Sequence, residues 1–295
     1  MCANSNHHTF PRFIIIGYAN HDVNRFSDGI EQFCVGGGGY FAALAASRVV
    51  PDAALVTRVG EDFNLAPLTG RVVSVAVSVI PGGKTALSLQ IYHDPNNLTD
   101  RSIELQPGVN PGITASDIPE EWIAKASVIL VSTMMPTQQR AIVEALVAKK
   151  RAETVSLEGV SIRLPIIAVD SDLCWLKEEE SSGEVRAMMR HADIAFMNRT
   201  EGEILQDLIP QIPLVVLKRD AEGAELLVRG ARQAAVSAPA VSVVDVTGAG
   251  DVVAGTFLAF LVSDKSAEES LVAAVSAASE SITKEGIEHM LKERT

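Results

Sequence analysis

The chain has 295 residues, of which 47% are apolar and 21% are charged, so it can bury a large core. A net charge of −12, with no local Lys/Arg cluster to reverse it, argues against nucleic acid or an acidic membrane surface as partners. The three cysteines show no C-x-x-C spacing, which gives no sign of a disulfide framework or a zinc site. No apolar run reaches the ~18 residues of a membrane span, and Met1–Phe10 contains no apolar signal core. We therefore expect a cytoplasmic protein that acts on a small molecule.

The first predicted strand is the apolar run Phe13–Ile16, which ends at Gly17. We expect residues 18–22 to form a loop at the carboxyl end of this strand, where parallel α/β sheets bind their ligands. Asp22 in this loop is a candidate ligand-binding residue, although an aspartate here can also simply stabilise a turn. The neighbouring His21 receives no catalytic role, because a histidine on a loop is often only exposed.

A glycine run at residues 36–39 leads into the helical pattern Tyr40–Val50. Glycines let the backbone approach a bound molecule closely and then start a helix, so Gly37 and Gly38 are candidate ligand contacts. The run is not a dinucleotide-binding fingerprint, because Phe41 occupies the place of the third glycine. The chain also lacks the Gly-Lys-Ser/Thr of a P-loop.

A second strand is predicted at Ala54–Val59. The next two β-rich runs, Val72–Val79 and Thr85–Tyr92, are separated by Pro81-Gly82-Gly83, which is typical of a hairpin. They interrupt the alternation of strands and helices. We interpret them as an accessory sheet outside the core.

From residue 124 onward, strands and helices alternate, which predicts a parallel sheet flanked by helices. Residues 154–164 form either an extra loop or a short hairpin. The predicted strands are Val128–Val131, Pro165–Val169 (followed by Asp170), Ile194–Met197, Leu214–Leu217 and Glu225–Val228, and the helices are Thr137–Lys149, Val185–Arg190 and Ala267–Thr283.

Two of these strands deliver polar side chains at their carboxyl ends. Asn198 and Glu201 have the spacing of a helix capping box, and an amide with a carboxylate also suits a Mg²⁺ ion that keeps several waters. Both interpretations can hold together. Lys218 follows Leu214–Leu217 and is either a phosphate contact or a solvated lysine.

The most informative stretch runs from Val241 to Asp251. Val241–Val244 is predicted to be a buried strand, and a long apolar helix is predicted after Gly250. The turn between them contains Gly248 and Gly250, and the amides of a helix N-terminus favour an anion such as phosphate. Asp251 in the first helical turn could accept a proton from a hydroxyl that attacks phosphorus, or it could only complement the helix dipole.

The string D-x-T-G-A-G-D at residues 245–251 resembles the C-terminal signature of the PfkB, or ribokinase-like, family of carbohydrate and nucleoside kinases. The glycine run before an alanine-rich helix resembles the family's N-terminal signature, and N-x-x-E at residues 198–201 occurs at the family's place in chain order. The resemblance covers nearly the whole chain. It implies one ribokinase-like α/β domain over residues 1–295, with three layers, a mainly parallel central sheet and a small β lid. The lid would come mainly from about residues 72–101, with part of residues 18–35.

The resemblance also implies a reaction, in which the γ-phosphoryl group of ATP moves to a substrate hydroxyl with the help of Mg²⁺. Asp251 would be the general base, and the amides of Gly248, Ala249 and Gly250 would hold the developing charge. Asn198 and Glu201 would support Mg²⁺ through water. The substrate would contact Asp22, Gly37, Gly38 and Phe41, and the nucleotide would contact Lys218, Gly223, Thr247, Gly248, Gly250, Ala278 and Ser279. Asp220 replaces the first glycine of the family's usual Gly-x-x-Gly turn.

Two sequence features, one of which departs from the pattern of ribokinases and adenosine kinases, predict the substrate class. Phe41 stands where ribokinases and adenosine kinases have a sugar-binding asparagine, and the His21-Asp22-Val23 string looks most like myo-inositol kinases. We therefore predict a small polyol or sugar, with myo-inositol as the first choice. A nucleoside or other sugar kinase of the same family, a dinucleotide-dependent oxidoreductase and a non-catalytic binding protein remain alternatives. The protein is a monomer, or a homodimer through exposed lid edges.

Overall fold

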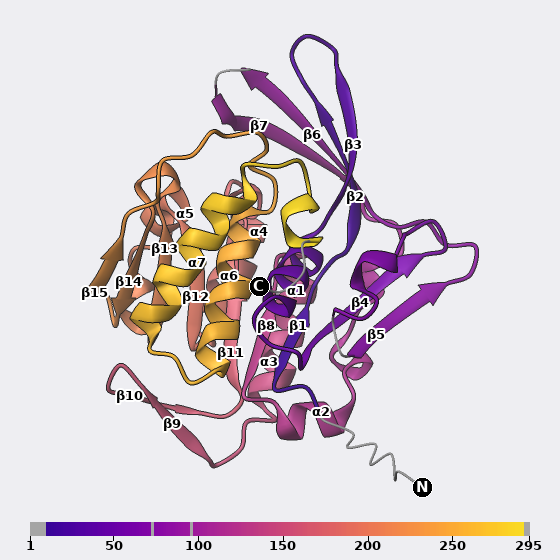
Figure 1. The fold of residues 1–295 in the computed structure, drawn as a ribbon. Helices are drawn as coiled ribbons and strands as arrows, with labels where there is room; N and C mark the ends of the chain where they lie inside the picture. The colour runs from indigo at the N-terminus through magenta and orange to yellow at the C-terminus, as the bar shows by residue number, and fades with distance from the viewer. Residues whose placement is uncertain (1–9, 72–73, 95–96, 292–295) are drawn as a thin grey trace, which may run out of the picture.

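The computed structural model describes residues 10–71, 74–94 and 97–291. Nine strands form the central sheet in the order β15-β14-β13-β12-β11-β8-β1-β4-β5 (Figure 1). Seven of these strands run parallel to one another: β1 (Phe13–Ile16), β4 (Ala53–Gly60), β5 (Ser74–Ile80), β8 (Val128–Val131), β11 (Ile166–Asp170), β12 (Ile194–Asn198) and β13 (Leu214–Lys218). At one end of the sheet, β14 (Ala224–Val228) and the edge strand β15 (Ala231–Val236) each pair antiparallel with the strand before them.

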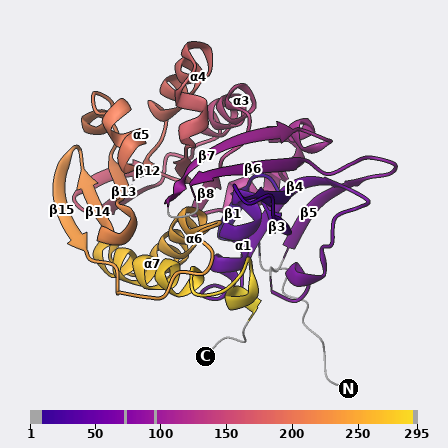
Figure 2. The same cartoon turned by 90° about the horizontal axis from the view of Figure 1, so that it is seen from above.

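Helices cover both faces of this sheet, which gives three layers (Figure 2). One layer contains α1 (Gly38–Ser47), α6 (Ala249–Val262) and α7 (Ala267–Ser281), and the other contains α2 (Glu120–Lys125), α3 (Pro136–Val147), α4 (Glu179–Met189) and α5 (Arg199–Ile204). The side chains of the first strand show why helices pack on both faces of the sheet. Phe13 and Ile15 pack in the core beside α1 and α6, whereas Ile14 and Ile16 pack in the core on the other face. The predicted three-layer α/β architecture with a mainly parallel central sheet is thus confirmed. No helix in the described ranges is long and apolar enough to span a membrane.

A separate four-stranded sheet projects beyond the end of β1 (Figure 1). Its order is β3 (Glu31–Gly36), β2 (Asn20–Arg25), β6 (Leu87–Asp94) and β7 (Asn97–Gln106). Residues 20–22 therefore lie on a strand. The prediction of a loop over residues 18–22 is wrong for residues 20–22. Residues 154–164 contain β9 (Thr154–Leu157) and β10 (Val160–Arg163), which pair as a hairpin. Of the two predicted alternatives, the short hairpin is therefore the one observed.

The predicted lid included residues 72–79, and the structure corrects this. Residues 74–80 form β5, which pairs in parallel with β4 at the edge of the central sheet, while residues 72–73 lie outside the described residues. The predicted hairpin across residues 81–83 is also wrong, because β5 and β6 belong to different sheets. Local β propensity predicted the strands but not their pairing partners, which are remote in sequence.

The predicted buried strand Val241–Val244 is wrong as well. These residues are irregular, and Val243 and Val244 are 52% and 53% exposed. The central sheet already ends at β15, so the segment finds no strand to pair with. It is attached instead to the end of α7, where the Val244 amide donates to the Ile282 carbonyl at 2.7 Å.

Candidate active site

The turn before α6 has the geometry predicted for an anion site. Gly248 is the N-cap residue with a φ of 75°, a conformation that favours glycine. The amides of Gly248 and Gly250 have no hydrogen-bond partner within the described part of the chain, whereas the Ala249 amide donates to the Val246 carbonyl at 3.2 Å. Asp245 holds the turn in place by accepting from the amides of Thr247 and Gly286, each at 2.9 Å. Two of the three predicted amides are therefore available to a ligand.

Asp251 lies in the first turn of α6, directly against the start of α1. A Cβ atom on Gly38 would come within 2.5 Å of Asp251 Oδ1, so the bare α-carbon of Gly38 makes room for the carboxylate. Gly37, the N-cap residue of α1, lies beside it. The two glycine motifs, more than 200 residues apart in sequence, thus meet at one place. The structure brings together the predicted base and the predicted substrate loop.

Phe41 does not lie where the prediction placed it. Its side chain is 1% exposed, and its ring packs directly against the α-carbon of Gly248, where any Cβ atom would overlap it. The ring is therefore covered by the turn itself, which supports a packing role for Phe41. The sequence placed Phe41 correctly on α1 but could not tell that its ring turns inward to support the anion turn.

The electrostatic surroundings of Asp251 suit a base that works near neutral pH. Burial and the nearby negative charge of Asp170 raise the pKa of Asp251 to about 7, against the opposing effect of Lys218. No hydrogen bond to the Asp251 carboxylate is found within the described residues. The carboxylate has no bond from the protein to compete with a substrate proton, and its raised pKa makes it a stronger base than an ordinary aspartate.

Lys218 brings a positive charge to the same turn. Its Nζ would lie 3.1 Å from a Cβ atom on Gly250, and it forms a two-pronged ion pair with Asp170 at 2.9 and 3.2 Å. Burial alone would lower the pKa of Lys218, but the charges of Asp170 and Glu201 raise it above its usual range. The ammonium therefore stays protonated beside the anion turn. Sequence reasoning noted Asp170 only as the end of a strand, although a carboxylate at the carboxyl end of a parallel strand was the same signal that selected Asp22.

Asp22 lies on β2 in the small sheet and is 3% exposed. Its two oxygens accept hydrogen bonds from Asn20 Nδ2 at 2.5 Å and from Gln90 Nε2 at 3.0 Å. Its charge also contributes to raising the pKa of Asp251. The small sheet therefore presents a carboxylate held by two amides near the base. Nothing in the local sequence marked Gln90, because its pairing with β2 is a long-range feature.

Asn198 and Glu201 form the predicted capping box at the start of α5. The Glu201 amide donates to Asn198 Oδ1 at 2.9 Å, and the Glu201 carboxylate accepts from the amide and the side chain of Asn198 at 2.8 and 2.7 Å. The Ser171 hydroxyl adds a further bond at 3.2 Å. Burial raises the pKa of Glu201 to about 7. Direct metal coordination does not fit a carboxylate that is 2% exposed and already bonded at both oxygens, whereas contact with a hydrated ion through water does. Among the described residues, no group of three or more His, Cys, Asp or Glu side chains could hold a metal ion.

The remaining predicted nucleotide contacts divide into two groups. Thr247 belongs to the anion turn, and its buried hydroxyl has no partner within the described ranges. Gly223, with a φ of 97°, precedes β14 and packs against the end of β15, without a described contact to the turn. Ala278 on α7 is half-buried, but Ser279 is only 5% exposed and offers almost no surface for a base.

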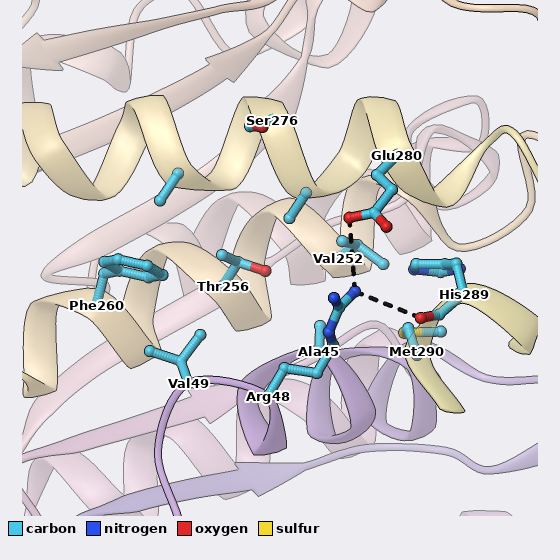
Figure 3. Close-up of a pocket in the computed structure, with 12 residues that line it drawn as sticks. Ala45, Arg48, Val49, Val252, Thr256, Phe260, Ser276, Glu280, His289 and Met290 are labelled. Carbon is cyan, nitrogen blue, oxygen red and sulfur yellow. Dashed lines mark hydrogen bonds and ion pairs between the residues drawn. The ribbon is translucent and has the colours of Figure 1, made fainter. Parts of the chain in front are cut away.

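A separate cavity of about 320 Å³ lies between α1, α6, α7 and the 3₁₀ turn Glu288–Leu291. None of the predicted site residues lines it. Figure 3 shows Arg48 reaching across one end toward Glu280 and the main-chain carbonyl of His289. The cavity belongs to the outer helix layer and is distinct from the anion turn.

Comparison with known proteins supports the same class. A cytidine kinase of Thermococcus kodakarensis is 26% identical over 262 residues, which cover 83% of this chain and 87% of that protein. The structure of ribokinase from Giardia lamblia matches with a TM-score of 0.78 at 17% identity, covering 97% of both chains. A putative ribokinase II from E. coli, in complex with ATP and Mg²⁺, matches with a TM-score of 0.75 at 16% identity, covering 96% of both chains.

The fold and the matched family define a ribokinase-like kinase, an ATP-dependent phosphotransferase that acts on a sugar or nucleoside. The family profile for "pfkB family carbohydrate kinase" matches residues 12–294. The chain belongs to the PfkB family, as its signature strings predicted.

Proposed function

We propose that this kinase transfers the γ-phosphoryl group of ATP to a hydroxyl of a small polyol or sugar, with myo-inositol as the first candidate. One observation carries the proposed chemistry. The Asp251 carboxylate, without a hydrogen-bond partner in the described residues, lies beside Gly38 and next to the free amides of Gly248 and Gly250. This arrangement supports the proposal of a base and an anion-binding turn within one helical turn.

In the proposed mechanism, Asp251 accepts the proton of the substrate hydroxyl as its oxygen attacks the phosphoryl group. The amides of Gly248 and Gly250 and the ammonium of Lys218 stabilise the negative charge that develops on the transferred group. Asp22, held by its two amide neighbours, binds other substrate hydroxyls. The small sheet covers the substrate and excludes water, which would otherwise compete as acceptor.

Nucleotide and metal contacts complete the proposal. Asn198 and Glu201 would order water around a bound Mg²⁺ ion, which would supply positive charge to the phosphates of ATP. Thr247 and Lys218 lie at the phosphate end, while Gly223 and Ala278 line the nucleotide further out. The ATP and Mg²⁺ complex of the putative ribokinase II, which has the same fold, supports this cofactor pair.

The substrate class has two candidates. The His21-Asp22-Val23 string supports a polyol such as myo-inositol. The cytidine kinase relative, at 26% identity, supports a nucleoside as the second candidate. Because Phe41 is buried, its replacement of the family's asparagine no longer separates the two classes. The carboxylate of Asp22 suits the neighbouring hydroxyls of either.

The test is ADP release from Mg-ATP with myo-inositol, other polyols, ribose, fructose, fructose phosphates, and the nucleosides adenosine, inosine and cytidine. Asp251→Asn is the control. We expect strong turnover with myo-inositol that the variant loses. Turnover with cytidine alone would keep the kinase and replace the polyol by a nucleoside. Absence of turnover with every compound would contradict the proposed function.

A further inference from the structure

Ser132 is a buried residue whose side chain has no visible structural role. It follows β8 directly, at the carboxyl edge of the central sheet, and is 1% exposed. Its backbone is well satisfied, because its amide donates to the Ile16 carbonyl at 2.8 Å and its carbonyl accepts from Gln139 Nε2 at 3.0 Å. Its hydroxyl, by contrast, has no hydrogen-bond partner among the described residues. A buried hydroxyl left in this state lowers stability, so it calls for an explanation.

The hydroxyl lies at the catalytic position. A Cβ atom on Gly38 would overlap Ser132 Oγ and would come within 2.5 Å of Asp251 Oδ1. The two groups therefore lie side by side against the α-carbon of Gly38. They do not bond to each other. Gly17, which follows β1, packs against Ser132 as well, since a Cβ atom there would lie 2.9 Å from the Ser132 Cβ. The Asp251 carboxylate and the free Ser132 hydroxyl thus lie next to each other, packed against glycine residues.

We propose that Ser132 is a substrate-binding residue that fixes the reacting hydroxyl against Asp251. The inference rests on the proposed function. The Ser132 hydroxyl donates a hydrogen bond to the substrate oxygen on the carbon next to the reacting carbon, while Asp251 faces the reacting hydroxyl itself. The substrate class that fits has two oxygens on adjacent carbons. A vicinal diol of a polyol has this arrangement, and so does a hydroxymethyl group beside the ring oxygen of a sugar or nucleoside.

Ser132 takes no part in bond making, so its contribution appears in substrate binding. A hydrogen bond made equally in the bound substrate and in the transition state lowers KM without changing kcat. Removing a hydrogen bond of ordinary strength from a closed site costs about tenfold in affinity. Because the hydroxyl is unsatisfied in the free protein, its removal should not destabilise the fold. A structural serine would show the opposite pattern.

The chain offers a matched control. Thr57 on β4 is also buried, at 2% exposed, and its hydroxyl also has no partner in the described ranges. No described contact places Thr57 beside Asp251. Thr57→Val therefore removes a buried hydroxyl of the same kind from a position outside the proposed site.

The experiment measures kcat, KM and Tm for the wild type, Ser132→Ala, Ser132→Cys and Thr57→Val, with myo-inositol, or with cytidine if only the nucleoside is turned over. We expect Ser132→Ala to raise KM about tenfold, with kcat within about threefold and Tm unchanged or higher. Ser132→Cys, a weak donor of similar size, should give an intermediate KM. Thr57→Val should leave KM unchanged.

Two failures are distinguishable. If the wild type turns over no compound of the panel, the proposed function fails and the inference fails with it. If the wild type is active but Ser132→Ala keeps its KM, only the role of Ser132 is overturned. A lower Tm with kcat reduced equally for every substrate would also overturn it, because that result defines a structural residue.

Discussion

Two acidic residues, Asp251 and Glu201, occupy similar positions and have different partners. Each lies in the first turn of a helix at the carboxyl edge of the central sheet, and burial raises the pKa of each to about 7. Glu201 accepts three hydrogen bonds, from Asn198 and Ser171. Asp251 accepts none from the described residues, and it faces Gly38 and the free amides of the anion turn.

This difference in hydrogen-bond partners indicates a structural role for the Glu201 carboxylate and a chemical role for the Asp251 carboxylate. Bonds from the protein occupy the oxygens of Glu201 and hold the start of α5 in place, which leaves the group suited to ordering water. Asp251 is only partly buried and has no such bonds within the described residues, so its oxygens remain open to solvent or to a substrate proton. We therefore expect the two residues to respond oppositely to the same change from carboxylate to amide.

Asp251→Asn should have the largest effect on activity. Loss of a general base typically costs ~10²–10⁴ in turnover, and nucleotide binding should remain measurable because the anion turn is intact. The variant should also be more stable than the wild type above pH 7, since the amide avoids burying a charge. A gain of roughly 1 kcal/mol would appear as about 2–4 °C in Tm. Steady-state kinetics with calorimetry measure both, and turnover within tenfold of the wild type would remove Asp251 from the mechanism.

The pH profile should show the second largest effect. Asp251 works as a base only when ionised, and its pKa is raised to about 7. Turnover should therefore fall about tenfold per pH unit below the pKa and reach a plateau above it.

Stability should follow the opposite trend. The unfolded carboxyl titrates near pH 4, so the folded state binds the extra proton between about pH 4 and 7. The contribution of Asp251 to stability is therefore lost as the pH rises through this window. Rates from pH 5 to 9 and unfolding from pH 4 to 9, compared with Asp251→Asn, check both trends. A flat rate profile down to pH 5 would contradict the assignment.

The sequence predicted the turn before α6 and the start of that helix, but it did not predict the partners of two strands. The turn, the capping box and the start of α6 depend on residues within a few positions of one another, so local patterns specify them. Strand pairing is not local. The run at residues 74–80 was correctly predicted as a strand but joined β4 instead of the small sheet, and Val241–Val244 found no partner at all.

The direction in which a side chain points also could not be predicted from the sequence. Phe41 was placed on the right helix, but its ring faces the core under Gly248 and not the substrate space. Asp170 and Ser132 reach the site only because β8 pairs with β1 and β11 lies between β8 and β12 in the central sheet. Their isolated sequence contexts carry no signature, although each follows a buried strand. A polar residue at the carboxyl end of a parallel strand, the signal that indicates Asp22, Asn198 and Lys218, therefore also indicates Asp170 and Ser132.

Glu201→Gln should have the smallest effect on turnover. The amide oxygen of glutamine can accept the bonds from the Asn198 amide and from Ser171, but its NH₂ group then faces the Asn198 side-chain NH₂. One hydrogen bond is lost, at a cost of about 1 kcal/mol, and relief of the buried charge offsets part of it. We expect turnover at saturating Mg²⁺ within about threefold of the wild type. The half-saturating Mg²⁺ concentration should rise about tenfold, as for other residues that order a metal's water shell. Mg²⁺ titration of the kinase rate separates the two roles. An unchanged Mg²⁺ requirement would leave Glu201 as a helix cap alone, whereas a collapse of turnover as deep as that of Asp251→Asn would mean that the carboxylate bonded by the protein also takes part in the chemistry.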